Sequence, residues 1–150
     1  MNFSVRTRNL LLRAGWKDNR KIDIRPYEQS LMEKGFPVFP VLVEFLERFG
    51  GLSFHNPSAK PPAIADWHFR VQDSVRHAFP NNIKAYGRIA ATKLSVIGEA
   101  SRDHLMLMMD ESGRIFGGYD DIFLVIGISG EDAIEGLCAG RIFKPFEPAA

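Results

Sequence analysis

The chain has 150 residues and a formal net charge of +1, and 45% of its residues are hydrophobic while 25% are charged. These proportions are typical of a globular domain and exclude a disordered or fibrous chain, and the low net charge gives no overall attraction to nucleic acid or membrane. The single cysteine excludes an internal disulfide and favours a reducing compartment, and no stretch resembles a secretory signal or a membrane span. We therefore expect one cytoplasmic domain over residues 1–150, with tails at 1–3 and 145–150.

Two short helices are predicted at the start of the chain. The first is capped by Ser4 and ends at Gly15, because Ser is a preferred N-cap and Gly a preferred residue after the last helical turn. The second begins at Pro26 and ends at Gly35. Pro suits the first turn of a helix because the N–H that it lacks would have no partner there.

The third predicted helix begins at Pro40 and is the most strongly amphipathic segment of the chain. Its apolar residues recur at the spacing of three and four that places them on one helical face: Val41, Leu42, Phe45, Leu46 and Phe49. Gly50 is expected to end this helix in the left-handed conformation, and Gly51 to let the chain turn away. The remaining elements must cover this face.

Strand patterns dominate after Leu52, beyond a loop at His55–Pro62. Alternation from Trp67 to Val71 predicts a half-buried strand, and Asp73–Gly87 is compatible with a short helix broken at Pro80–Asn82. Further strands are predicted at Leu94–Ile97, His104–Met109, Arg114–Tyr119 and Ile122–Ile126. The methionine-rich segment before Asp110 is apolar on both faces, which is typical of a central strand.

A last helix is predicted from a cap at Ser129, through Cys138, to Gly140. Helices first, strands second and one helix last is an α+β order. It predicts a mostly antiparallel sheet packed against N-terminal helices and one C-terminal helix.

The chain resembles the SUKH superfamily of bacterial immunity proteins, and within it the third group. The residues that carry the resemblance are Ala14-Gly15-Trp16 with Arg20, Phe45-Leu46-x-x-Phe49-Gly50-Gly51-Leu52, Ile97-Gly98-Glu99, Met109 to Arg114, and Gly127-x-Ser129 with Ala133 and Gly140. The resemblance covers nearly the whole chain. It implies an α+β fold and a non-enzymatic protein that protects bacteria from polymorphic toxins, many of them nucleases or deaminases.

No catalytic, metal or cofactor site is predicted from the sequence. A catalytic carboxylate pair lies about 5–10 Å apart, whereas Asp110 and Asp120 bracket a strand with ends roughly 20 Å apart unless Gly117-Gly118 forms a bulge. The four histidines lack metal-ligand spacing, the glycine pairs do not match a phosphate loop, and Cys138 sits in an apolar helix without a nucleophile motif.

The N-terminal segment is basic, but only Trp16 among its aromatic residues fits a nucleic-acid footprint. We interpret its cations as a solvated face that makes no direct contact with nucleic acid: Arg6, Arg8, Arg13, Lys17, Arg20, Lys21 and Arg25. We expect Trp16 in the core and Arg20 in a structural pair.

The predicted partner-binding surface consists of acidic residues at strand ends and at the start of the last helix: Asp110, Glu111, Asp120, Asp121 and Glu131. We expect them to be exposed and free of structural partners, so that they match the basic clefts of nucleic-acid-directed toxins. Alternatively, these acids only serve as turn and cap residues. For the whole protein, the alternatives are an interaction or scaffold domain of the same fold without a toxin partner, and a small enzyme with an unrecognised pocket. The oligomeric state is not predicted.

Overall fold

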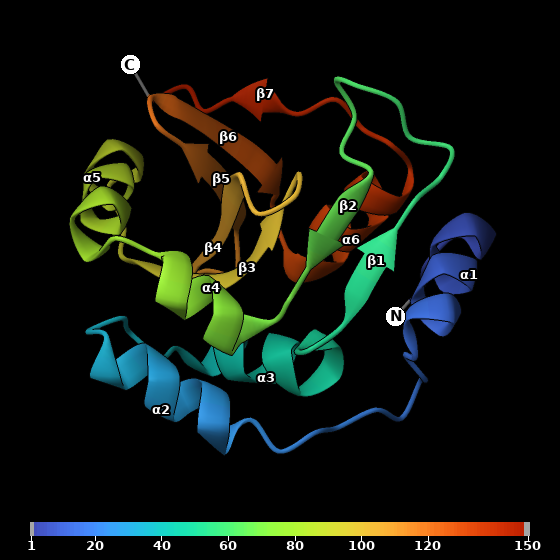
Figure 1. The fold of residues 1–150 in the computed structure, drawn as a ribbon, viewed down its shortest axis with the longest axis horizontal. Helices are drawn as coiled ribbons and strands as arrows, with labels where there is room; N and C mark the ends of the chain where they lie inside the picture. Colours follow the sequence, from blue (N-terminus) through green and yellow to red (C-terminus); the bar gives the residue numbers. More distant parts are fainter. Residues whose placement is uncertain (1, 149–150) are drawn as a thin grey trace.

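The computed structural model describes residues 2–148, which form six helices and one seven-stranded sheet (Figure 1). The helices are α1 (Val5–Ala14), α2 (Arg25–Glu33), α3 (Pro40–Phe49), α4 (Val71–His77), α5 (Pro80–Ala90) and α6 (Gly130–Cys138). The strands are β1 (Ser53–His55), β2 (Asp66–His68), β3 (Leu94–Ala100), β4 (Leu105–Asp110), β5 (Ile115–Tyr119), β6 (Ile122–Gly127) and β7 (Lys144–Pro145). The predicted α+β class is confirmed.

The sheet is an antiparallel meander in which each strand pairs with the strand before it in the sequence, in the order β1-β2-β3-β4-β5-β6-β7. The helical segments α4–α5 and α6 are inserted between consecutive strands. β4 is the middle strand, and Met108 and Met109 are fully buried in it. The prediction of a central methionine-rich strand is confirmed.

The boundaries of α1 follow the predicted signals. The Ser4 hydroxyl accepts a hydrogen bond from the Thr7 N–H at 3.2 Å, and Gly15 has φ +100°. Trp16 is then buried at 1% exposure and stacks on Phe49 of α3, as expected for a core residue.

The helix α3 begins at Pro40 and buries Leu42, Phe45, Leu46 and Phe49, which confirms its predicted apolar face. The prediction for its end was wrong. Gly50 has φ −57° and is not left-handed, whereas the following Gly51 has φ +83°. Gly50 serves close packing instead, because a Cβ there would lie 2.6 Å from the Leu46 carbonyl oxygen.

The segment after Trp67 also differs from the prediction. The strand β2 ends at His68, and Val71 is the first residue of α4. Val71 is apolar because it belongs to the buried face of this helix, and it therefore extends the alternation of the strand in the sequence alone. Pro80 does not break a helix but begins α5, in the role that Pro40 has in α3.

Two short strands at the sheet edges were not predicted. β1 ends at His55, the first residue of the expected loop, and β7 includes Pro145 of the expected C-terminal tail. Both ends of the described chain pack on the domain: Phe3 lies edge-on to Trp16, and Phe146 packs against Phe123. Phe3 and Phe146 thus contact aromatic residues of the domain.

The helices lie around the edges and faces of the sheet (Figure 1). α4 and α5 pack near β3, α2 lies against α4, and α6 packs on β6 and against α1. No helix among residues 2–148 is long and apolar enough to span a membrane.

Candidate functional site

Asp110 is placed differently from the sequence-based expectation, because its side chain is buried at 1% exposure. Its carboxylate accepts hydrogen bonds from the N–H and hydroxyl of Ser112 and from the N–H and Nε of Arg114, and it pairs with the Arg114 guanidinium at 2.8 Å. Asp110 therefore closes the β4–β5 turn. The expectation that it is exposed and free of partners was wrong, since three hydrogen bonds reach Oδ1 and the Arg114 side chain binds Oδ2.

The other four predicted acids are exposed, and the sheet divides them between two ends. Glu111 lies in the β4–β5 turn and Glu131 follows β6, at the end of the sheet where Ile115 pairs with Gly127. Asp120 and Asp121 lie at the opposite end, in the β5–β6 turn. The two pairs are separated by the length of β5, roughly 15–20 Å.

Tyr86 lies close to Asp120 and Asp121, and their charges affect the pKa of its hydroxyl. The Tyr86 hydroxyl donates a hydrogen bond to the Asp120 carbonyl at 2.7 Å. The pKa of Tyr86 is raised from its ordinary value, mainly because the side chain is part-buried and additionally because both carboxylates lie nearby. Their side chains themselves remain exposed.

Glu131 lines a depression of mixed charge between α3 and the start of α6, in which Arg20, Lys21 and Arg48 lie among the acids. This depression also holds Glu44 and Glu47 from α3, and Lys21 pairs with Glu47 at 4.0 Å. Val41 lines the same depression and lies against the β4–β5 turn, since a Cβ on Gly113 would be 3.0 Å from its Cγ2. Carboxylates from three separate elements thus gather at this end of the sheet.

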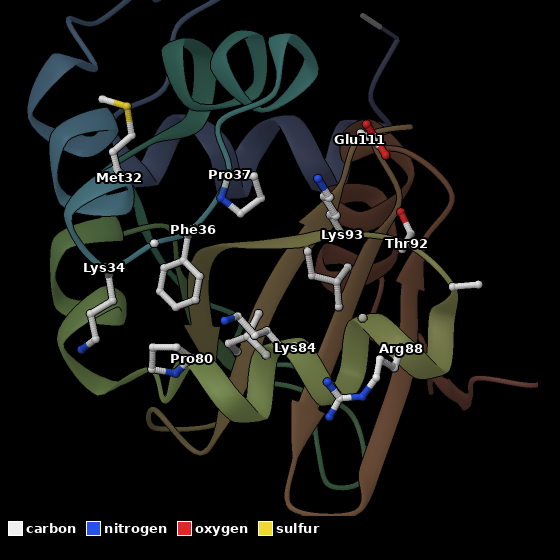
Figure 2. Close-up of a pocket in the computed structure, with 15 residues that line it drawn as sticks. Met32, Lys34, Phe36, Pro37, Pro80, Lys84, Arg88, Thr92, Lys93 and Glu111 are labelled. Carbon is white, nitrogen blue, oxygen red and sulfur yellow. The ribbon is translucent and has the colours of Figure 1, made fainter.

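A larger groove of about 950 Å³ lies between the end of α2 and α5 (Figure 2). Met32 and Lys34 lie at one end of it, and Thr92, Lys93 and Glu111 at the other. Its apolar lining consists mainly of Met32, Phe36, Pro37, Pro80, Ile83 and Leu94. Sequence reasoning did not find this groove, because its walls come from segments separated by more than 40 residues.

The groove is bordered by basic side chains. Lys34 is tied to the fold, since its Nζ donates to the Val75 carbonyl at 3.0 Å. Lys84, Arg88 and Lys93 are exposed and form no hydrogen bond or ion pair with the residues that the structure describes. The available signal in the sequence was the i, i+4 spacing of Lys84 and Arg88 in a helix without an acidic residue.

Two histidines and two acids meet in a cluster beside β2 and β3. His68 Nε2 lies 2.9 Å from Asp103 Oδ1 and 3.7 Å from the buried carboxylate of Glu99. The Nδ1 atom of His77 lies 3.0 Å from the same carboxylate on its other side. Local spacing could not reveal this cluster, because it unites two strands, a helix and the loop after β3.

The ligand atoms of His68, Glu99 and Asp103 all lie within 4.8 Å of one another, a spacing that would fit a metal ion. The tautomer of His68 argues for a different role. Its Nδ1 accepts a hydrogen bond from the Arg70 N–H at 3.0 Å, so the ring proton of the neutral side chain is on Nε2. Nε2 then donates to Asp103 instead of offering a lone pair, and the cluster as built is a hydrogen-bonded network.

Cys138 and Glu135 of α6 have structural roles. Burial raises the pKa of the Cys138 thiol to about 12, so a reactive thiolate is disfavoured. Burial alone would raise the pKa of Glu135, but hydrogen bonds from Ser4 and Thr7 lower it below its ordinary value. Glu135 thereby fastens α1 to α6.

Arg20 is also used inside the fold, as expected. Its guanidinium donates to the carbonyls of Arg48 and Gly50, each at 2.8 Å. These bonds hold the end of α3 against the loop that follows Trp16.

The molecule is thus a small α+β domain in which charged side chains border the surface depressions. Residues 3–140 match the family model described as SUKH-3 immunity protein, and the chain belongs to that family. A search of curated proteins found no match, and a search of solved structures found none. Proteins of this family are typically non-enzymatic, and membership implies toxin immunity and a cognate toxin partner.

Proposed function

We propose that this protein neutralises a cognate toxin in the cytoplasm by binding it, without chemical turnover. The observation that carries the proposal is the family match over residues 3–140, which includes nearly every element of the fold. A nuclease or a deaminase is the toxin class that suits it best, because such toxins carry basic clefts for phosphate.

The proposed contact surface consists of the exposed carboxylates at the two ends of β5, which are Glu111, Glu131, Asp120 and Asp121. Asp110 is excluded because its carboxylate already accepts four hydrogen bonds within the turn. At the end that holds Glu131, the exposed Glu44 lines the same depression and adds a further carboxylate, beside the cations Arg20, Lys21 and Arg48. Like charges gathered on a surface steer a partner of opposite charge and raise its association rate.

The test measures association with the toxin encoded beside this protein's gene, at low and at high salt. Two double variants separate the two ends: Glu111→Gln with Glu131→Gln, and Asp120→Asn with Asp121→Asn. If an end contacts the toxin, its variant should associate about tenfold more slowly at low salt and converge with wild type at high salt. Glu28→Gln with Glu33→Gln on α2 removes the same charge elsewhere and serves as the matched control.

If both double variants associate with the toxin as fast as wild type, and salt does not change the rate, the proposal of an acidic contact surface is refuted. Stoichiometry separates the alternative functions. Binding predicts complete neutralisation at one protein per toxin, whereas an enzyme would neutralise many toxin molecules per copy. An interaction domain without a toxin would not bind the encoded neighbour at all.

A further inference from the structure

We propose that the groove between α2 and α5 is a second binding site, which takes an extended acidic segment with apolar side chains from a partner protein. It is distinct from the carboxylates proposed to contact the toxin, apart from Glu111 at one end. The charge and the lining of the groove point to this ligand independently of the toxin.

The first observation is uncompensated positive charge. Lys84 and Arg88 lie one helical turn apart on the same face of α5, and Lys93 follows just beyond the helix. Like charges at i, i+4 destabilise a helix slightly, and no acidic side chain among residues 2–148 forms an ion pair with these three cations. A partner that supplies carboxylates would relieve this repulsion.

The second observation is the apolar floor between the cations. Phe36, Ile83 and Leu94 are buried and form its base, whereas Met32 at the rim is 61% exposed. An exposed Met beside a groove can adapt to different apolar side chains. The floor would shelter such side chains, while the cations would hold the carboxylates beside them.

The distribution of charge favours a peptide over other anions. The cations follow the length of the groove instead of converging on one point, so they fit carboxylates spaced along a chain better than a single phosphate (Figure 2). The one aromatic residue of the lining, Phe36, is buried at 5% exposure and offers no platform for a base to stack on. Glu111 closes one end and would repel a continuous polyanion such as a nucleic-acid strand.

The experiment uses fluorescence anisotropy with a labelled acidic peptide in which Glu and Asp flank Leu and Phe. Its length is about ten residues, which spans roughly 30 Å when extended. A second peptide replaces Leu and Phe by Ser at the same charge, and a thymidine oligonucleotide tests the nucleic-acid alternative. The variants are Lys84→Glu/Arg88→Glu/Lys93→Glu together and, separately, Met32→Ser, whose exposed site preserves the fold.

Wild type should bind the acidic–apolar peptide at low salt, and the triple variant should bind about tenfold or more weakly because three charge pairs are lost. Met32→Ser should lower the affinity for this peptide and leave the affinity for the serine peptide unchanged. The matched control reverses three exposed cations outside the groove, Arg6→Glu/Arg13→Glu/Lys17→Glu, and should stay within about twofold of wild type.

Several outcomes would overturn the proposal. They are equal binding by wild type and the triple variant, equal affinity for the two peptides, preference for the oligonucleotide, or self-association that the triple variant abolishes. Because the assay contains no toxin, none of these outcomes bears on the proposed toxin contacts.

Discussion

The helices α3 and α5 are built alike and used differently. Each begins with a proline at its first position and buries an apolar inner face, of which Phe45 and Ile83 are members. Their outer faces differ. The Arg48 guanidinium of α3 donates to the Asp18 carbonyl and lies over Trp16, whereas Arg88 of α5 has no polar partner among the residues that the structure describes.

The two arginines illustrate two kinds of surface charge. Some charged side chains form contacts within the fold, and others have no partner in it and are free to contact another molecule. A cation with carbonyl and aromatic neighbours contributes to stability, so its exposure says little about binding. A row of like charges without partners contributes nothing to the fold and slightly opposes it. The contrast identifies the outer face of α5 as a surface kept for another molecule.

The largest expected effect concerns the inner faces, where the two helices should behave alike. Phe45→Ala should lower the free energy of unfolding by about 3–5 kcal/mol, and Ile83→Ala by about 2–5 kcal/mol, because each leaves a cavity in the core. Chemical denaturation of both variants measures this. The matched control, Glu44→Ala, removes an exposed side chain and should be close to neutral. An unchanged stability of Ile83→Ala would show that α5 is not anchored as α3 is.

A smaller effect should separate two neighbouring acids of the β4–β5 turn. Asp110→Ala should lower the free energy of unfolding by about 2–4 kcal/mol, because it removes a buried carboxylate and leaves the Arg114 and Ser112 donors without their acceptor. Glu111→Ala, one residue along, should change it by less than about 0.5 kcal/mol. Denaturation curves of the two variants provide the comparison, and equal losses would contradict the division between used and available charge.

The sequence predicted the class of fold well, because its signals are local. Caps such as Ser4 and Ser129, the proline at the start of α3 and the apolar β4 strand each depend on a few adjacent residues. Local patterns failed where a helix followed a strand without a change in apolar spacing, as at Val71. They also failed for β1 and β7, since edge strands this short depend on their neighbours for pairing.

The candidate sites were harder to predict because they are assembled over long separations. Asp110 is the exception, because its partners Ser112 and Arg114 lie only two and four residues along the chain, so the signal for its burial was present in the local sequence. The groove required knowledge of which helix lies beside α2. The sequence contains one sign of the groove, the i, i+4 spacing of Lys84 and Arg88. That spacing indicates a binding site only in combination with the apolar lining beside it, which the structure shows.

The smallest expected effect tests the outer faces directly, with one arginine from each helix. Arg48→Ala should lower the free energy of unfolding by about 1 kcal/mol, because the Asp18 carbonyl loses its donor and Trp16 loses the guanidinium over its ring. Arg88→Ala should leave stability within about 0.5 kcal/mol of wild type and slightly raise it at low salt, because the repulsion of Lys84 is removed and alanine favours the helix. Thermal unfolding at low and high salt measures both variants, and the gain for Arg88→Ala should disappear as salt screens the charges. A loss at Arg88 as large as that at Arg48 would mean that α5 uses its outer face for folding, and the case for keeping this face for a partner would fail.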